Sequence, residues 1–363
     1  MVRRMGNPLS PEALADPVLL TRALVDVESV SHHEKALCDS IDEALRRLPH
    51  LSVDRLGNTL MARTDLGREQ RVILAGHLDT VPVDGNLPST VVDDLIYGCG
   101  SADMKSGLAL ALHLAGTLPE PRYDLTFLLY EAEEVDARFN GLGLVAESCP
   151  DWLRADFAVL LEPTYGVVEA GCQGTMRATV RTEGLRAHTA RAWRGVNAIH
   201  AAGEVLRRLA DYRARTVTID GCTYREGLSA VRIAGGVAGN VVPDECAVDV
   251  NLRFALDRTE SDALEHLREV FDGFDVELAD SAPGAMPGLT AAPAREFVAA
   301  VGEAPAAKLG WTDVARFAAL GIPALNYGPG DPVLAHAPDE HVEIGKIRDG
   351  AATLHRWLAV PAF

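Results

Sequence analysis

The chain lacks any pair of cysteines spaced for metal binding or for redox chemistry. Its cysteines are scattered along 363 residues, and no two of them form a Cys-x-x-Cys pair. Neither a thiolate zinc site nor a disulfide framework is therefore supported, and the pattern fits a reducing cytoplasm. The cysteines are Cys38, Cys99, Cys149, Cys172, Cys222 and Cys246.

Long apolar runs are also missing. No segment is apolar over enough residues to cross a bilayer, and residues 1–8 carry charge without an apolar stretch behind them. The sequence therefore predicts neither a membrane span nor an export signal, and we expect a cytoplasmic protein.

Positive charge is scarce relative to negative charge. Lys and Arg number 34 against 52 Asp and Glu, and the net charge of −18 is spread along the chain rather than gathered in blocks. This balance argues against nucleic acid and against an anionic membrane as partners. An anionic substrate would need local cations. The group Arg186, Arg191 and Arg194 is a candidate, although a solvated helix start explains the same cluster.

Two common catalytic motifs are absent. Residues 100–106 resemble a phosphate-binding loop, but Lys105 stands where that motif requires its second glycine. No Gly-x-Ser-x-Gly sequence occurs either, so a serine hydrolase is a poor alternative. The glycines of this region instead suit a tight turn that presents Asp103.

A histidine and an aspartate close an apolar run that reads as a buried strand over residues 71–77. Strand residues two apart point to the same side. His77 can therefore ligate a cation while Asp79 accepts the proton of the other ring nitrogen. This pair predicts the beginning of a metal site.

More groups of ligand type follow or interrupt other apolar segments. Residues 124–130 read as a strand buried on both faces, and Glu133 and Glu134 follow it closely. Carboxylates in such a place must be paired, protonated or metal-bound. A single histidine after a strand or a Glu-Glu pair is often only a solvated group, but five groups together predict a metal site. The five are His77, Asp103, Glu134, Glu162 and His336.

The number of candidate ligands favours two metal ions over one. A single catalytic zinc takes about three protein ligands and keeps a position for water. If Asp103 bridges two ions about 3.5–4 Å apart, each ion has three protein ligands, and Glu133 is left to act as general base. Nitrogen and carboxylate ligands without thiolate suit zinc, although cobalt or manganese would also fit.

These motifs resemble those of the M20 family of metal-dependent amidohydrolases and peptidases, most closely its actinobacterial succinyl-diaminopimelate desuccinylases. The resemblance covers nearly the whole chain. It is carried by residues 76–82, 100–107, 131–135, 161–164, 239–245 and 335–340.

The resemblance implies a role for each residue of the metal site. Glu133 would be the general base, and the peptide bond between Asp103 and Met104 would be cis. The implied ligands are His77 and Glu162 for one ion, Glu134 and His336 for the other, and the bridging Asp103 for both.

Three residues outside the metal site also acquire implied roles. In the family, a histidine matched by His188 reaches from a neighbouring subunit to the oxyanion, so the resemblance implies a homodimer. Asn240 and Arg253 match residues that contact carboxylate or carbonyl groups of the substrate. Asn240 could equally be a turn residue, and Arg253 an ordinary cation at a strand edge.

The implied reaction is hydrolysis of an amide bond in a small N-acyl amino acid. For N-succinyl-LL-2,6-diaminopimelate, the products would be succinate and LL-2,6-diaminopimelate, a precursor of lysine and peptidoglycan. The chain departs from better-known desuccinylases at residues 171–174 and 310–313 and at Pro332, positions that line the acyl pocket in the family. Acetylornithine deacetylation and dipeptide cleavage therefore stay open. A binding or assembly protein that kept the fold is a further alternative, although the five candidate ligands and the candidate base Glu133 are all present.

The pattern of elements, together with the resemblance, predicts an α/β fold with a mixed sheet and helices on both faces, interrupted by a smaller α+β dimerisation domain. Helical stretches are expected at residues 14–27, 34–48, 106–118, 198–212 and 261–270, and strands of the inserted domain at 175–182, 231–238 and 246–254. We expect a discontinuous di-metal domain of residues 1–173 and 285–363, because His336 follows the insertion at 174–284.

Overall fold

The computed structural model describes residues 9–360, which form two compact units. Unit 1 contains the residues up to Ala170, then Pro287–Ala306 and the residues from Arg316 onward. Unit 2 contains Gly171–Met286 and Ala307–Ala315. The absence of an export signal was inferred from residues 1–8, which lie outside the described residues, as do residues 361–363.

The limits of unit 2 differ from the predicted insertion at 174–284, chiefly because unit 2 includes residues 307–315. These residues contact the segment that enters unit 2. The N–H of Gln173 donates to the carbonyl oxygen of Lys308 at 3.3 Å, and the thiol of Cys172 lies 3.6 Å from the carbonyl oxygen of Thr312. Residues 307–315 therefore belong to unit 2, because they contact a segment that is distant in the sequence.

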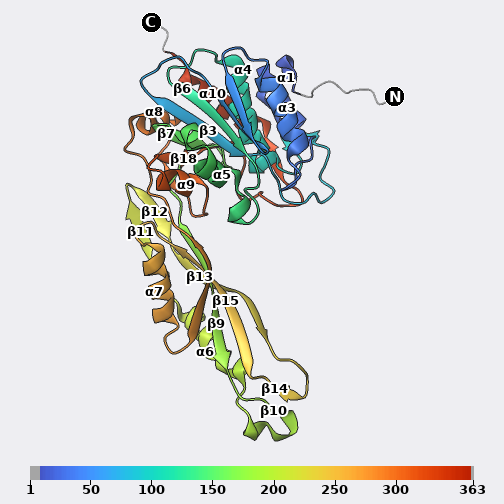
Figure 1. The fold of residues 1–363 in the computed structure, drawn as a ribbon, viewed down its shortest axis with the longest axis vertical. Helices are drawn as coiled ribbons and strands as arrows, with labels where there is room; N and C mark the ends of the chain where they lie inside the picture. The colour runs from blue at the N-terminus through green and yellow to red at the C-terminus, as the bar shows by residue number, and fades with distance from the viewer. Residues whose placement is uncertain (1–8, 361–363) are drawn as a thin grey trace, which may run out of the picture. The chain divides into compact units, whose positions relative to one another are not determined.

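An eight-stranded mixed sheet forms the centre of unit 1, in the order β1-β2-β6-β3-β7-β18-β8-β17 (Figure 1). Strand β3 pairs in parallel with β6 and β7, and β7 with β18, whereas β2 and β8 are antiparallel to β6 and β18. The predicted mixed α/β sheet is confirmed. The strands are β1 Ser52–Leu56, β2 Thr59–Arg63, β3 Arg71–His77, β6 Asp124–Tyr130, β7 Phe157–Leu160, β8 Glu169–Ala170, β17 Ala306–Ala307 and β18 Ala324–Asn326.

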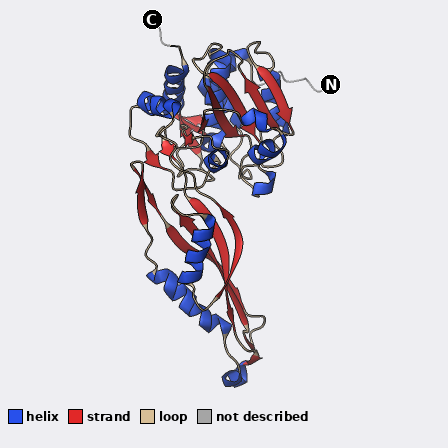
Figure 2. Ribbon diagram, turned by 60° about the vertical axis from the view of Figure 1, so that its left-hand side comes forward, coloured by secondary structure: helices blue, strands red, loops and turns tan. Residues whose placement is uncertain are grey.

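Helices lie to either side of this sheet (Figure 2). Helix α4 packs on β3 and β6, and α10 packs on α4. The helices are α1 Pro11–Ala15, α2 Pro17–Val25, α3 Lys35–Leu45, α4 Ser106–Thr117, α5 Gly141–Ser148, α8 Ala292–Val301, α9 Val314–Ala319 and α10 Ile344–Leu358. A small sheet contains β4 Thr90–Val92, β5 Leu95–Tyr97 and β19 His341–Glu343. Within residues 9–360, every helix is too short or too polar to span a bilayer.

The single helix predicted over residues 14–27 is wrong. The structure divides this stretch into α1 and α2 at Asp16, whose backbone is extended with φ −126° and ψ 108°. The ring of Pro17 disfavours helical geometry at the preceding residue. The Asp16 carboxylate then accepts the N–H groups of Val18 and Leu19 at 2.8 and 3.2 Å, so this residue begins the second helix.

Unit 2 is built on a four-stranded antiparallel sheet in the order β13-β15-β9-β16. Alternate residues of β9 and β15 are buried, as expected for a sheet covered on one face, and α6 and α7 pack on it. The strand predicted over 231–238 is β13, which ends at Gly235 because Gly236 takes a φ of +85°. The elements are β9 Gly174–Glu183, β13 Gly227–Gly235, β15 Glu245–Phe254, β16 Asp275–Ala282, α6 Ala198–Asp211 and α7 Glu260–Val270.

Two short pairs of strands complete unit 2. Strands β11 (Thr216–Ile219) and β12 (Cys222–Arg225) form a hairpin. Strand β10 (Ala187–His188) pairs with β14 (Val241–Val242), beyond one end of β9 and β15 in Figure 1.

Candidate metal centre

His77 is the last residue of β3, and its ring is held from one side by Asp79. Both residues are buried. The Nδ1 atom lies 3.0 Å from the Asp79 carbonyl oxygen and 3.4 Å from its carboxylate. Because both neighbours of Nδ1 are acceptors, this nitrogen carries the proton in the neutral ring. The lone pair of Nε2 is then available to a cation, as the spacing predicts.

The Asp79 carboxylate also holds the loop that follows β6. It accepts the N–H groups of Glu133 and Glu134 at 3.0 and 3.1 Å and the hydroxyl of Ser31 at 2.7 Å. Burial disfavours the ionised form, but the hydrogen bond and charge of His77, together with the other donors, lower the pKa of Asp79 to about 2. One buried carboxylate thus orients a candidate ligand on β3 and two carboxylates after β6.

Asp103 lies in a turn directly before α4. Gly98 and Gly100 have φ values of +155° and +78°, which glycine adopts readily and which shape this turn. The peptide bond between Asp103 and Met104 is cis, as predicted. The backbone of Asp103 and Met104 is not helical, and Lys105 then leads directly into α4, so the position of Asp103 is tied to a helix that packs on β3 and β6.

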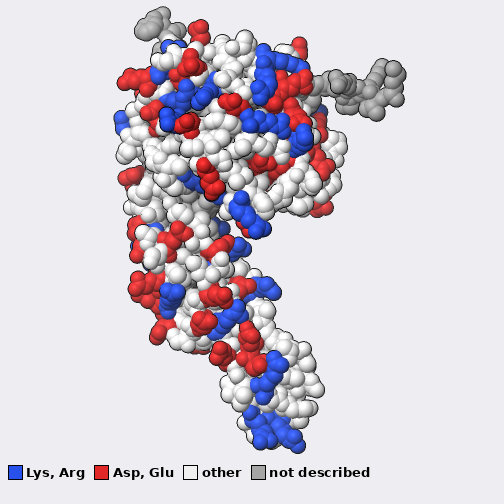
Figure 3. Space-filling model, in the orientation of Figure 1, with Lys and Arg blue, Asp and Glu red and all other residues white. Residues whose placement is uncertain are grey.

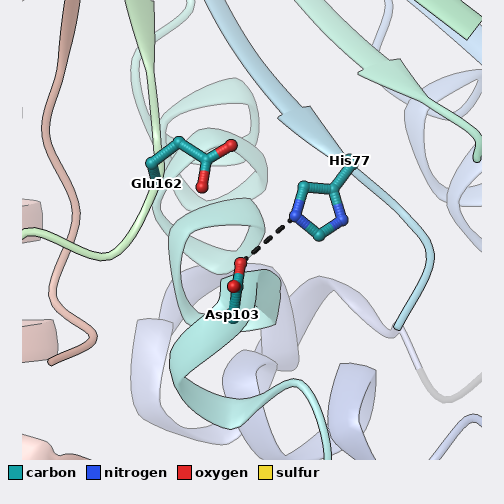
Figure 4. A group of neighbouring side chains, drawn as sticks. All are labelled: His77, Asp103 and Glu162. Atoms are coloured by element: carbon teal, nitrogen blue, oxygen red, sulfur yellow. Dashed lines mark hydrogen bonds and ion pairs between the residues drawn. The ribbon is translucent and has the colours of Figure 1, made fainter. Parts of the chain in front are cut away.

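The two carboxylate oxygens of Asp103 face two different histidines. Its Oδ1 lies 3.2 Å from His77 Nε2, and its Oδ2 lies 3.6 Å from His336 Nε2. On the first side, Glu162 from the segment after β7 completes a group whose ligand atoms all lie within 4.8 Å of one another (Figure 4). On the second side, Glu134 completes an equivalent group. This arrangement can hold one cation on each side of a shared carboxylate.

His336 and Glu134 are already in contact. Their Nε2 and Oε1 atoms are 2.8 Å apart, and this hydrogen bond is the main cause that raises the pKa of His336 to about 9. Burial of the His77 ring, the largest single influence, lowers its pKa, but Asp103 and Asp79 together outweigh burial and raise it. A metal ligand must be the neutral imidazole, so protons compete with metal ions for both histidines.

Glu133 belongs to a third possible ligand group, with His77 and Glu134. The ligand atoms of this group also lie within 4.8 Å of one another. Distances alone therefore do not separate the predicted base, Glu133, from the predicted ligand, Glu134. The backbone N–H groups of Glu133 and Glu134 donate to the same carboxylate, that of Asp79, and the two residues are neighbours in the sequence.

The remaining predicted site residues belong to unit 2. His188 and Asn240 lie together, because His188 pairs with Val241 and the Asn240 carbonyl oxygen accepts the N–H of Thr189 at 3.0 Å. The Nδ1 atom of His188 accepts the N–H of Ala190 at 3.1 Å. In the neutral ring the proton is then on Nε2, which can donate a hydrogen bond outward.

Arg253 is distant from this pair within unit 2. It lies near the far end of β15 and pairs with Thr175 and Gly227, whereas β14 precedes the other end of that strand. The eight steps from Glu245 to Arg253 span about 26 Å at about 3.3 Å per residue. The structure thus brings His188 and Asn240 together but separates them from Arg253 within one copy of the chain.

The arginine group noted in the sequence flanks His188 along the chain. Arg191 and Arg194 are exposed on η4 (Thr189–Arg194), and Arg186 pairs with Asp244 at 2.8 Å. Figure 3 shows Lys and Arg side chains gathered at the end of unit 2 that carries β10. Their exposure fits both interpretations made from the sequence, a solvated surface and a cationic site for an anionic substrate.

Two of the segments in which the chain departs from better-known desuccinylases lie side by side in unit 2. Residues 171–174 contact 307–315 through the Gln173 and Cys172 contacts described above. Gln173 and Thr312 are buried, and Trp311 donates its indole N–H to the carbonyl oxygen of Pro283 at 3.1 Å. The two departures therefore meet at the contact between Cys172 and Thr312.

Sequence reasoning missed Glu340. This buried carboxylate accepts the N–H groups of Gly100, Ala102 and Asp103 at 2.9, 2.8 and 2.9 Å. Burial is the largest influence and raises its pKa, although the three N–H groups oppose the shift. Its only sequence signal was an acidic residue four positions after His336, in a segment that carried the resemblance.

Comparison with known proteins agrees with this geometry. Residues 73–359 match peptidase family M20/M25/M40. A protein of Mycobacterium tuberculosis described as a putative succinyl-diaminopimelate desuccinylase is 57% identical over 94% of this chain and 98% of its own length. A succinyl-diaminopimelate desuccinylase of Corynebacterium glutamicum is 48% identical over 98% of this chain and 100% of its own.

A solved structure shares the fold. The tripeptidase of Staphylococcus aureus superposes with a TM-score of 0.78 at 22% identity, covering 97% of this chain and 98% of its own. At that identity the likeness concerns the fold alone. The family match covers most of the chain and includes every predicted metal ligand, so the resemblance inferred from the motifs is confirmed. The chain belongs to peptidase family M20/M25/M40.

Proposed function

We propose that the protein is a metal-dependent amidohydrolase that removes succinate from N-succinyl-LL-2,6-diaminopimelate. Two relatives at 57% and 48% identity, both matched over almost their whole length, carry that activity in their names. The observation that carries the chemistry is the Asp103 carboxylate, which presents one oxygen to His77 and the other to His336. We propose the cytoplasm as the location, which suits the free state of all six cysteines.

Two divalent ions, most suitably zinc, fit this set of donors. In the proposed assignment, His77 and Glu162 hold one ion and Glu134 and His336 the other, with Asp103 shared. Each position offers imidazole nitrogen and carboxylate oxygen without thiolate, a donor set that zinc favours and that cobalt or manganese also accepts. When bound, such ions polarise an amide carbonyl and lower the pKa of water in the site.

The side chains around the metal positions perform the proton transfers in the proposed mechanism. Glu133 takes a proton from the attacking water and delivers it to the nitrogen of the departing amine. Asp79 keeps this base in place by accepting the backbone N–H of Glu133, and it holds His77 in one tautomer. Both functions of Asp79 act through other residues, so it is a positioning residue in this scheme.

His188 is proposed to stabilise the oxyanion from a second copy of the chain. Its Nε2 carries the proton and can donate to a developing negative charge. Arg253 is proposed to contact a carboxylate or carbonyl group of the substrate. Within unit 2, the distance between Arg253 and His188 is longer than one small substrate can span. If both residues serve one substrate, they come from different copies, and Asn240 accompanies His188.

A homodimer through β13 would supply the second copy. This strand lies at one edge of its sheet. Val231 is 60% exposed and Ile233 is 50% exposed. Exposed apolar edge strands favour pairing with another chain. Helix α6 adds Ile199 and Leu206, each 41% exposed, to the apolar surface of unit 2. A two-fold arrangement would bury the same residues on both copies.

The variant Ile233→Asp is expected to be a monomer, because a charge on each copy would be buried at the interface. Light scattering coupled to size-exclusion chromatography measures the mass directly. Leu19→Asp is the matched control, since Leu19 is 49% exposed on α2 of unit 1. It should remain a dimer. A wild-type protein that is monomeric and fully active, or an Ile233→Asp variant with unchanged mass, would contradict the proposed interface.

A substrate screen tests the proposed activity. Zinc-loaded protein should hydrolyse N-succinyl-LL-2,6-diaminopimelate with a higher kcat/KM than N-acetylornithine or simple dipeptides, as measured by release of the free amine. The protein treated with a chelator is the control and should be inactive until metal is restored. If the protein prefers N-acetylornithine or a dipeptide, the proposed metal-dependent hydrolysis stands, but the proposed substrate is wrong. Hydrolysis of none of them would favour a binding or assembly role.

A further inference from the structure

Glu340 has no part in the proposed reaction, yet it is one of the most strongly held carboxylates near the site. Its side chain is buried, with 2% of the residue exposed, and it accepts hydrogen bonds from three backbone N–H groups. Its Oε1 accepts from Ala102 and Asp103, and its Oε2 accepts from Gly100. Three convergent N–H dipoles form a concave site for an anion, which Glu340 fills from a distant part of the chain.

The backbone of Glu340 ties the same two segments together. Its carbonyl oxygen accepts the N–H of Gly98 at 3.0 Å, and its own N–H donates to the carbonyl oxygen of Ala337 at 3.0 Å. Residues 336–340 are thus attached to the turn of residues 98–103 through both main chain and side chain. One of these segments carries His336 and the other carries Asp103. The Nε2 atom of His336 lies 3.6 Å from the Oδ2 atom of Asp103.

The chemistry at this position calls for a carboxylate. A carboxylate only accepts hydrogen bonds and can satisfy all three N–H groups, whereas the amide of glutamine would turn a donor toward one of them. A buried N–H group that loses its acceptor is left without the hydrogen bond that offset its removal from water. The expected response to that loss is a shift of the turn, which moves Asp103 relative to His336.

We propose that Glu340 is a positioning residue that fixes the separation between Asp103 and His336, and thereby the affinity of the metal position held by Glu134 and His336. The inference rests on the proposed two-metal site. The position that uses His336 depends on Glu340 through two ligands, His336 and Asp103. The position that uses His77 and Glu162 depends on it only through the shared Asp103.

Metal titration of the full-length, metal-free protein tests this inference without any substrate. Zinc is added in competition with a chelating indicator, and the stoichiometry and both dissociation constants are fitted. Wild-type protein should bind two ions per chain. In Glu340→Gln, the affinity of one position should fall about 10–100-fold, as for other residues that orient metal ligands, and the other should change by less than about threefold.

Asp124→Asn is the matched control. Asp124 is also buried and accepts the backbone N–H groups of Leu66 and Arg68 at 2.8 and 2.9 Å, but it lies at the start of β6, away from the ligands. This variant should lose thermal stability and keep both metal affinities. If Glu340→Gln does not fold, Glu340→Asp keeps the charge and shortens its reach, and it should show the same selective loss.

A double variant identifies the affected position. His336→Ala removes the position in question, so adding Glu340→Gln to it should change the remaining affinity by less than about threefold. The inference is overturned by unchanged affinities in Glu340→Gln, by equal losses at both positions, or by a further large loss in the double variant. Wild-type protein that binds a single ion overturns the two-metal proposal itself. Two bound ions without hydrolysis of the succinyl substrate would refute only the proposed substrate.

Discussion

The variant Glu133→Gln is expected to lower kcat about 10²–10⁴-fold while both metal ions stay bound, because it removes the proposed general base and no proposed ligand. Glutamine has nearly the same size as glutamate and keeps the backbone N–H that Asp79 accepts. The measurement pairs steady-state kinetics on the succinyl substrate with metal analysis of the same preparation. KM should change much less than kcat, since the base acts in the transition state.

The neighbouring variant Glu134→Gln provides the contrast. It removes a charged ligand that lies 2.8 Å from His336, so one of the two ions should be lost or bound far more weakly. The structure groups both glutamates with His77, so this pair of experiments decides the assignment that distances leave open. Equal metal loss in both variants would show that Glu133 is also a ligand. Substantial activity in Glu133→Gln would remove it as the base.

The variant His188→Ala is expected to lower kcat about 10²–10³-fold, because it removes a hydrogen-bond donor to the oxyanion. Metal content should be unchanged, since His188 belongs to unit 2 and all proposed ligands belong to unit 1. The stronger test is to mix this variant with Glu133→Gln. If His188 acts across the dimer, a mixed dimer contains one site with both groups intact, and part of the activity returns.

The mixing experiment needs evidence that subunits exchange. Copies with different affinity tags report the fraction of mixed dimers, and activity should rise in proportion to that fraction. A Glu133→Gln protein mixed with a Glu133→Gln, His188→Ala double variant is the control, because none of its dimers contains an intact base. Mixed dimers without recovered activity would show that His188 acts within its own copy or has no catalytic role.

Features with a local cause could be predicted from the sequence. The end of one apolar run predicts His77 beside Asp79, which the structure shows although β3 ends at His77, and the apolar run before Glu133 identifies β6. Glycines before Asp103 indicate a tight turn, which the structure contains. The structure groups the five candidate ligands, and each of them follows an apolar strand or sits in a turn or loop; their roles as ligands stay a prediction.

Features that depend on pairing between distant segments were not predictable. The three N–H groups held by Glu340 come from residues about 240 positions earlier, and nothing in the local pattern of 335–340 reveals them. Residues 307–315 join unit 2 through contacts with Cys172 and Gln173, again without a local signal. The break at Asp16 differs from these cases, because it has a local cause: Pro17 disfavours helical geometry at the residue before it.

The position of β18 imposes an order on biosynthesis. In the sheet of unit 1 this strand lies between β7 and β8, although the ribosome makes both neighbours before it begins unit 2. At about 5–20 residues per second, translation from residue 171 to residue 326 takes on the order of ten to thirty seconds. During that interval the facing edges of two buried strands have no partner, which makes them templates for aggregation. The nascent chain, rather than the finished enzyme, is therefore the form in which we expect chaperones to recognise this protein.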